Sequence, residues 1–316
     1  FIWIMGVSIT LSFKSITRKK VKASVVLRKI VRRSLILFGL GVFTSNFNDL
    51  EFYRIPGVLQ RFAICYFVIA LMQLYLPPRE EVQKRWWDPI RDVITLWKQW
   101  LVMAVVVVIF LIVTYGIKVG DCPTGYTGPG GIGEGFPLAV NCTGGVANYI
   151  DSKFLGNHIY RWPTVKGLFK TTLPHDPEGC LGSLTSAFLV FLGVQGVIGI
   201  GLCGGTKNEG AIPINKNLWS LSFICVTGAT SFFLLTACYI LTDAFDWWNG
   251  APFFYPGMNA ILLYVGHGIL YDRFPFTWKL DEYGTHADKL AMHLIGTALW
   301  ILISFYLFKK KFFLKI

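Results

Sequence analysis

The hydrophobic and polar positions of this chain fall into long apolar runs separated by short polar strings. Each complete run is long enough to cross the roughly 30 Å hydrocarbon core of a bilayer as a helix. The runs are Phe1–Phe13, Ile30–Asn46, Gly57–Leu76, Gln99–Ile117, Leu181–Cys203, Leu218–Leu241, Phe253–Tyr271 and Leu290–Phe308. The pattern predicts an all-α fold: a polytopic transmembrane bundle of about eight segments in one membrane domain, 1–316, with its first segment truncated.

The composition supports a membrane protein and argues against a soluble one. Of the 316 residues, 53% are hydrophobic and only 15% are charged, whereas soluble domains carry nearer a quarter charged residues. The net charge of +12 does not indicate nucleic-acid binding, because basic residues concentrate in two short stretches, Lys14–Arg33 and Lys309–Lys315. Short basic loops beside apolar spans mark the cytosolic face. Anionic lipid or a phosphorylated cofactor is an alternative partner for these charges.

The charge pattern conflicts with a simple alternation of the spans across the membrane. With Lys14–Arg33 in the cytosol, alternation places Lys309–Lys311 outside, against the positive-inside rule. We therefore expect that one helix and its loop are absent between Gln195 and Asn208, where the apolar run gives way to glycines. A broken or re-entrant segment at that place is the alternative.

The segment 118–180 is predicted to be a long Gly-rich loop on the lumenal side. It contains one N-glycosylation sequon, at Asn141, and two cysteines that flank its glycine-rich part, Cys122 and Cys142. A sequon and a cysteine pair indicate an oxidising, non-cytosolic compartment, where a Cys122–Cys142 disulfide would close the loop. The glycines follow no strand and open no helix, which argues against a nucleotide-binding loop.

Charged residues stand at the ends of two runs, where they are costly without a partner. Arg54 and Arg61 bracket a Pro-Gly pair at the start of a span. Their guanidinium groups can form paired hydrogen bonds to phosphate or carboxylate. The alternative is that they reach the interface and pair with an acidic neighbour such as Glu51. At the start of a later span, Asp176 suits a helix cap, whereas Glu178 suits a base for an amine. An ion pair between Arg54 and Glu178 is a further expectation.

Amides, an ammonium group and a hydroxyl lie close together at the start of the sixth run. Asn215, Lys216, Asn217 and Ser220 suit a sugar or the carbonyl oxygen of a thioester. The plainer account makes Asn217 a helix cap and Trp219 an interface anchor.

Two polar residues lie inside the seventh run. Asn259 and His267 are eight residues apart, so in a continuous helix they share a face at about 12 Å separation. Polar groups at that spacing within a membrane line a cavity or face a partner helix. The five histidines of the chain show no metal-ligand spacing, so no metal site is expected.

Several of these strings, in this order, resemble those of heparan-alpha-glucosaminide N-acetyltransferases. The matching strings are Arg54–Arg61, Cys122–Tyr126, Gly128–Gly133, Asn141–Gly145, Asp176–Gly179, Asn208–Gly210, Pro213–Ser222, Pro252–Asn259 and Tyr264–His267. The resemblance covers nearly the whole chain. It implies a multi-pass lysosomal membrane enzyme that moves acetyl from cytosolic acetyl-CoA to the terminal glucosamine of heparan sulfate in the lumen.

The resemblance shapes the expected site. We expect catalytic roles for Glu178, Asn217, Asn259 and His267. Contacts to substrate or acetyl-CoA are expected from Arg54, Arg61, Asn215, Lys216, Trp219 and Ser220. Heparan sulfate, acetyl-CoA, membrane lipid and a second copy of the chain are the expected partners.

The chain departs from the family's pattern in two ways. The family's catalytic histidine lies upstream of Phe1, so none of the five histidines inherits its role, and this stretch alone is expected to be an inactive fragment. The family also has one more span between the positions of Gln195 and Asn208. A transporter or channel without chemistry, or a noncatalytic relative, is the rival reading.

Overall fold

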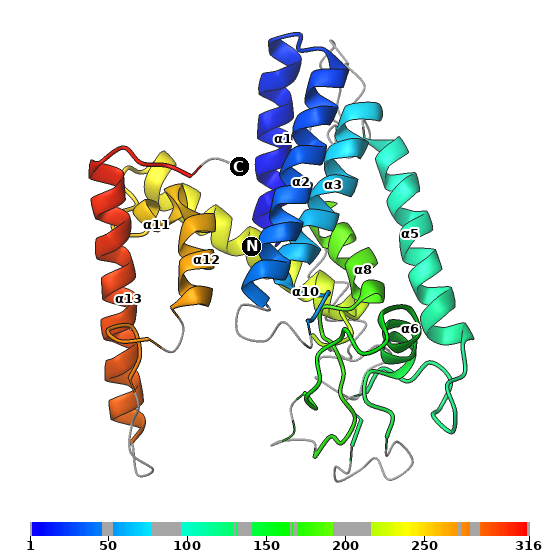
Figure 1. Ribbon diagram of the computed structural model, residues 1–316. Helices are drawn as coiled ribbons and strands as arrows, with labels where there is room; N and C mark the ends of the chain where they lie inside the picture. The colour runs from blue at the N-terminus through cyan, green and yellow to red at the C-terminus, as the bar shows by residue number, and fades with distance from the viewer. Residues whose placement is uncertain are drawn as a thin grey trace. The chain divides into compact units, whose positions relative to one another are not determined.

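The computed structural model of the protein describes residues 2–45, 53–77, 96–128, 130–131, 141–164, 166, 170–191, 216–270, 273–278 and 285–314. Within these ranges all regular structure is helical, which confirms the all-α prediction. The helices are α1 (Ile2–Arg18), α2 (Ala23–Ser45), α3 (Val58–Tyr75), α5 (Trp97–Gly116), α6 (Gly145–Leu155), α8 (Cys180–Phe191), α10 (Leu221–Tyr239), the π-helical turn η3 (Ile240–Ala244), α11 (Phe254–Met258), α12 (Ala260–Ile269) and α13 (His286–Lys309) (Figure 1).

The chain divides into two compact units, each described by itself. The first comprises Phe1–Val42 and Asp49–Leu234, and the second comprises Phe43–Asn48 and Leu235–Ile316. The first unit therefore holds α1, α3, α5, α6, α8 and most of α2 and α10, whereas the second holds η3 and the three last helices.

Helix α8 is the centre of the first unit. It packs against α1, α3, α5 and α6, and nearly every residue from Leu181 to Val190 is buried. Small side chains on α8, such as Gly182, Ser183 and Ser186, allow neighbouring helices to approach closely, as is common between membrane helices. On α1 the same closeness requires Gly6, because a Cβ there would lie 2.1 Å from the carbonyl oxygen of Val190.

Two apolar clusters hold these helices together. The larger joins α1, α3, α5, α8 and α10, and its buried members include Trp3, Cys65, Met103, Phe188 and Ile224. The smaller joins α5, α6 and α8 with the residues before α10, through Phe110, Ala147, Leu181 and Leu218. The second cluster fixes α6 beside the start of α8, and this placement matters for the site.

Four helices are long and apolar enough to cross a membrane among the residues that the structure describes: α3, α5, α10 with η3, and α13. Helix α5 shows the pattern most clearly, because its outer face is as apolar as its inner one. Its exposed large side chains are Leu101, Val105, Val108, Ile109 and Ile112, which helical spacing places on one stripe. A stripe of this kind is unfavourable in water and favourable in lipid, as expected of a polytopic membrane protein.

Three predicted segments differ from the structure. The loop predicted over 118–180 contains α6, an amphipathic helix that packs its apolar face on α8. The predicted run Phe253–Tyr271 is broken at Asn259, with α11 before it and α12 after it. The run Leu181–Cys203 is helical to Phe191, and the expected missing crossing between Gln195 and Asn208 lies outside the described residues.

In the second unit, a cluster of aromatic rings joins α11 to α13. Tyr255 contacts Phe305 and Phe308 edge-on, with ring centres 5.1 and 5.2 Å apart, and Phe254 contacts Phe308 at 5.3 Å. The break at Asn259 is also stabilised, because its amide donates to the carbonyl of Phe312 at 2.8 Å and accepts from the backbone N–H of Leu314 at 3.0 Å. The side chain thus replaces helical hydrogen bonds that the break removes.

Candidate functional site

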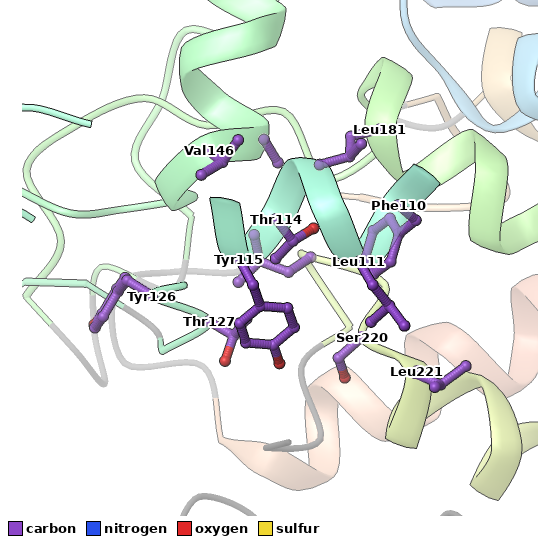
Figure 2. Close-up of a pocket in the computed structure, with 12 residues that line it drawn as sticks. Phe110, Leu111, Thr114, Tyr115, Tyr126, Thr127, Val146, Leu181, Ser220 and Leu221 are labelled. Atoms are coloured by element: carbon purple, nitrogen blue, oxygen red, sulfur yellow. The ribbon is translucent and has the colours of Figure 1, made fainter. Parts of the chain in front are cut away.

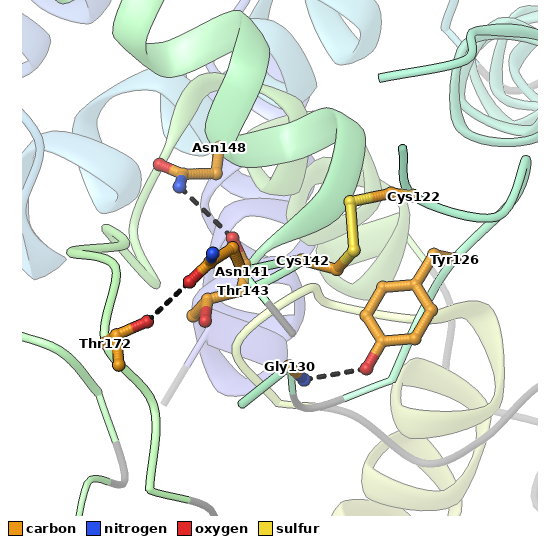
Figure 3. Close-up of a disulfide and its surroundings, with 8 residues drawn as sticks. All are labelled: Cys122, Tyr126, Gly130, Asn141, Cys142, Thr143, Asn148 and Thr172. Atoms are coloured by element: carbon orange, nitrogen blue, oxygen red, sulfur yellow. Dashed lines mark hydrogen bonds between the residues drawn. A yellow bond between two sulfur atoms is a disulfide. The ribbon is translucent and has the colours of Figure 1, made fainter. Parts of the chain in front are cut away.

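The predicted disulfide is present in the first unit. Cys122 and Cys142 are bonded, and their α-carbons are 5.7 Å apart (Figure 3). The hydroxyl of Tyr126 accepts the backbone N–H of Gly130 at 2.8 Å, which folds the glycine-rich turn back on itself. The sequon residue Asn141 is exposed, and its Oδ1 accepts the hydroxyl of Thr172 at 2.9 Å. This bond uses the side-chain oxygen of Asn141 and not the amide nitrogen, which is the atom that a glycan would modify.

Arg54 is held in an extended segment just before α3. Tyr53 stacks on the ring of His158 with centres 4.1 Å apart, and the backbone N–H of Ile55 donates to the carbonyl of His158 at 3.0 Å. Pro56 requires an extended residue before it, so the chain enters α3 in a fixed direction. The Arg54 side chain is thereby directed to the turn that precedes α8.

An ionic cluster joins Arg54 to both carboxylates of that turn. The guanidinium binds Asp176 through two parallel hydrogen bonds, of which Nε to Oδ2 is 2.7 Å, and its Nη2 also donates to Glu178 Oε2 at 2.7 Å. Asp176 has no exposed side-chain surface, and it also accepts the backbone N–H groups of Tyr160 and Glu178, each at 3.0 Å. The Arg54–Glu178 ion pair is therefore confirmed, and Asp176 is the more deeply bound partner.

The electrostatics of the cluster favour its charged form. Burial alone would lower the pKa of Arg54, but the hydrogen bonds and charges of Asp176 and Glu178 outweigh burial and raise this pKa. Asp176 has its acceptor sites filled by four donors, whereas only Oε2 of Glu178 is bonded by the described residues. Glu178, with 17% of its side chain exposed, is the more accessible carboxylate of the pair.

Arg61 approaches the same turn from inside α3. It is 2% exposed, and its Nη2 donates to the backbone carbonyls of Pro177 at 3.0 Å and Gly179 at 3.2 Å. Its guanidinium carbon lies 4.3 Å from the ring centre of Trp219, and a Cβ at Gly182 would lie 2.9 Å from Nη2. Its Nε and Nη1 are buried and have no hydrogen-bond partner among the residues that the structure describes. A buried guanidinium with two idle donors is suited to an oxygen-rich ligand.

Residues before α10 complete this cluster. Trp219 is held at φ = 50°, a left-handed conformation that costs a bulky residue of order 1–3 kcal/mol. The turn that requires it places the ring on Arg61. The amide of Asn217 lies 3.4 Å from the hydroxyl of Thr164, and Ser220 is buried with its hydroxyl 3.1 Å from that of Ser222. Lys216 is exposed, and Asn215 lies outside the described residues.

His175 and Asp151 are buried groups that the sequence patterns did not assign to the site. The Nε2 atom of His175 lies 3.2 Å from the carbonyl of Asn217, and burial lowers the pKa of the imidazole. Asp151 on α6 has no exposed surface, and its Oδ1 accepts the backbone N–H of Cys180 at 2.8 Å. A signal existed for Asp151, because it stands one helical turn after Ala147 on the buried face of α6.

A small pocket adjoins the cluster. It has a volume of about 10 Å³, lies between α5, α6, α8 and the start of α10, and includes the side chains of Thr114, Leu181 and Ser220 in its lining (Figure 2). A space of this size holds about one water molecule. It is too small for a sugar or a coenzyme.

The two other predicted residues, Asn259 and His267, belong to the second unit. Asn259 uses both amide atoms on the backbone near the end of the chain, as described above. His267 on α12 lines a cavity of about 480 Å³ together with Phe276, His293 and Trp300. Whether either residue takes part in chemistry stays a prediction. Among the described residues, no group of three His, Cys, Asp or Glu side chains is arranged to hold a metal ion.

The helical spans and the buried ionic cluster at their ends define a polytopic membrane protein with a polar site. Comparison with known proteins identifies a narrower class. The chain is 40% identical over 352 aligned positions to human heparan-alpha-glucosaminide N-acetyltransferase and 41% identical over 353 positions to the mouse enzyme, in both cases along its whole length. The resemblance seen in the sequence strings is therefore confirmed.

These matches also have limits. The chain spans about half the length of the curated relatives it matches, 53% of the human enzyme and 54% of the mouse enzyme. The alignments are longer than the 316 residues of the chain, so the relatives carry internal residues with no counterpart here. This agrees with an absent segment but does not locate it. No protein-family model matches the chain.

Proposed function

We propose that this protein transfers acetyl from acetyl-CoA to the terminal glucosamine amine of heparan sulfate. The observation that carries the proposal is the meeting of Arg54, Arg61, Asp176 and Glu178 at the start of α8, in a chain 40% identical throughout to a named N-acetyltransferase. Such a cluster is expensive in a membrane protein unless it serves chemistry or binding.

The donor set fits an acetyl thioester with its phosphates. Arg61 offers Nε and Nη1, which are buried and unbonded within the described part of the chain, to an acceptor oxygen, and Trp219 covers the face of the same guanidinium. Oriented donors in a site that excludes water stabilise developing negative charge most strongly. The basic stretch Lys14–Arg33 supplies cations for the phosphate groups of acetyl-CoA on the cytosolic side.

Glu178 is the residue we assign to the acceptor amine. The amine attacks the thioester carbonyl after losing a proton, the C–S bond breaks, and the thiol of coenzyme A leaves with a proton. Glu178 accepts the amine proton, while Arg54 holds its Oε2 and Asp176 holds Arg54. Asn217, Lys216 and Ser220 lie on the segment around Trp219, whose ring covers Arg61. We assign these three residues, and Asn215 of the same string, to binding and orienting the substrates.

The remaining assignments follow the family. We place the protein in the lysosomal membrane as a multi-pass glycoprotein of heparan sulfate degradation, with Asn141 glycosylated, segment 118–180 in the lumen and a second copy of the chain as a possible partner. The exposed Asn141 and the Cys122–Cys142 disulfide support an oxidising compartment for that loop. We also assign catalytic roles to Asn259 and His267, which belong to the second unit.

The test is acetyl transfer from acetyl-CoA to glucosamine by the full-length protein in detergent. Glu178→Gln keeps the shape and the hydrogen bond to Arg54 but cannot accept a proton, so turnover should fall about 100-fold or more. The matched control is Asp121→Asn, an exposed carboxylate of the same loop region, which should leave turnover unchanged. Unchanged turnover in Glu178→Gln would dismiss the assigned role.

A transporter without chemistry remains the second candidate, because one observation favours it. The span predicted over Phe253–Tyr271 is broken at Asn259, and broken helices are common where transporters bind their substrates. A transporter would move its substrate into vesicles without consuming acetyl-CoA. Flux of glucosamine in the absence of acetyl-CoA would therefore support this candidate against the enzyme.

A further inference from the structure

The turn formed by residues 176–179, which binds Arg54 and Arg61, is held by hydrogen bonds on two sides. On one side, Asp176 accepts the N–H of Glu178 and binds Arg54. On the other side, Asp151 reaches across from α6 and accepts the N–H of Cys180 at the first residue of α8. Between these two fastenings lie Pro177 and Gly179, whose carbonyls are the acceptors for Arg61.

The carboxylate of Asp151 packs directly against Gly179 in this turn. A Cβ placed on Gly179 would lie only 1.7 Å from Oδ2 of Asp151, so the carboxylate occupies the volume that a side chain at this position would need. Oδ2 is buried and has no hydrogen-bond partner in the described ranges, whereas Oδ1 accepts the N–H of Cys180. A carboxylate oxygen left in this condition is costly for a fold, so it needs an explanation.

We propose that Asp151 is a positioning residue of the site: its carboxyl group fixes Gly179 and Cys180, and through them the carbonyls that orient Arg61, and its proton binding changes that orientation. The inference rests on the proposed function where activity is the readout. Asp151 contacts neither Arg61 nor Glu178 through a hydrogen bond, so it acts through the turn rather than on the substrate.

The groups around Asp151 make its protonation sensitive to mildly acidic pH. It faces the backbone and thiol of Cys180 on α8, the Asp176 carboxylate of the turn and the Arg61 guanidinium of α3. Burial raises the pKa of Asp151 to about 6, the hydrogen bond from Cys180 opposes this rise, and the negative charge of Asp176 adds to it. The group therefore exchanges a proton in a range that a lumenal compartment can reach.

The consequence for stability has a definite sign. Unfolded Asp151 would lose its proton near pH 3.8, whereas the folded protein keeps it to about pH 6. The folded state therefore binds more protons between these values, and this contribution to stability is present at low pH and lost as the pH rises through about 6. The effect can be measured by thermal unfolding, without any activity assay.

The deciding variant is Asp151→Asn. Its side-chain oxygen still accepts the N–H of Cys180, but it carries no charge and takes no proton in this range. We expect two changes: the fall in melting temperature between pH 3.8 and about 6 that Asp151 causes should disappear, and the pH profile of acetyl transfer should lose its inflection near pH 6. A residue that only holds the fold would change the melting profile but not the pH profile of acetyl transfer, so an unchanged transfer profile in Asp151→Asn would overturn the proposal.

Two further variants keep the test decisive. Gly179→Ala displaces Asp151 and should lower acetyl transfer on the order of 10- to 100-fold, and the double change with Asp151→Ala should recover part of the loss by making room. Asp121→Asn is the exposed carboxylate control and should alter neither profile. A different outcome would separate the two proposals. If the melting temperature depends on pH as expected but neither the wild type nor any variant transfers acetyl, the proposed function is wrong and the assignment of Asp151 still stands.

Discussion

The guanidinium of Arg61 lies against the ring of Trp219, with 4.3 Å between the guanidinium carbon and the ring centre. Arg61 lies in the first turn of α3, and Trp219 lies in the turn before α10, held in a left-handed backbone conformation. Their contact shields a buried charge whose hydrogen-bond partners among the described residues are two backbone carbonyls. It shows that polar strings far apart in the chain form one site.

This contact predicts energetic coupling between the two residues. Trp219→Leu and Arg61→Met should each destabilise the protein, and the double variant should lose less than their sum by about 1–2 kcal/mol, because a desolvated cation on an indole ring contributes that much. The measurement is denaturant unfolding in detergent for all four proteins. If the free-energy losses of the two single variants add up to that of the double variant, the two side chains do not interact energetically.

Asp176 should matter more for stability than Glu178. Asp176→Asn removes the buried charge that the half-buried Arg54 guanidinium binds most closely, which should cost about 3 kcal/mol. Glu178→Gln removes a partly exposed carboxylate and should cost about 1 kcal/mol or less. Thermal unfolding ranks the two variants against Asp121→Asn, and equal losses for Asp176 and Glu178 would contradict the order of burial found here.

The disulfide should stabilise the segment that carries the turn. Replacing both Cys122 and Cys142 by serine opens a loop closed over a sequence separation of 20, at a cost of about 3 kcal/mol. Reductant should lower the melting temperature of the wild type but not that of the double variant. Cys238→Ser, which removes a free cysteine, is the control and should respond to reductant as the wild type does.

Asn259 can be tested for its structural role apart from any catalytic one. Asn259→Ala removes one donor and one acceptor from the backbone of Phe312 and Leu314, at a cost of about 2 kcal/mol. Hydrogen exchange at the Leu314 amide should become faster, because that amide loses its acceptor. A loss of acetyl transfer with unchanged exchange at Leu314 would instead indicate a direct role in chemistry.

His175 should make the protein less stable in acid. Its folded pKa is lowered by burial from the ordinary value of 6.5, so the unfolded chain takes up a proton first as the pH falls. Stability from this group is therefore present above about pH 6.5 and lost below it, opposite in sign to the contribution of Asp151. His175→Gln, whose amide can still donate to the Asn217 carbonyl, should flatten this acid slope of the melting temperature. An unaltered slope would contradict a neutral His175 in the folded state.

Much of the architecture was predictable from the sequence. The runs Gly57–Leu76, Gln99–Ile117 and Leu290–Phe308 correspond closely to α3, α5 and α13, because length and apolarity alone mark a span. Helix α6 was missed, since an 11-residue amphipathic helix amid glycines has too few apolar positions to stand out. Continuity through Asn259 was wrongly predicted, because the hydrogen bonds that stabilise the break come from residues 312–314.

The candidate site was predicted only as a set of residues. The strings identified Arg54, Arg61, Glu178 and Trp219, and the Arg54–Glu178 pair was expected, but the two-sided fastening of the turn by Asp176 and Asp151 was not. Local chemistry suggested a helix cap for Asp176, but its carboxylate accepts the N–H of Glu178 in the turn before α8 and binds Arg54. The N–H of Cys180, the first residue of α8, is accepted by Asp151 instead.

Sequence by itself determined what kind of molecule this is, since hydropathy, a sequon, a cysteine pair and several polar strings are all local properties of the chain. Tertiary structure alone decided which carboxylate each arginine meets, which histidine is buried neutral and why Gly179 has no side chain. Those facts depend on α3, α6 and α8 packing within a few ångströms of one another, and burial, which sets the cost of every charge there, exists only after that packing.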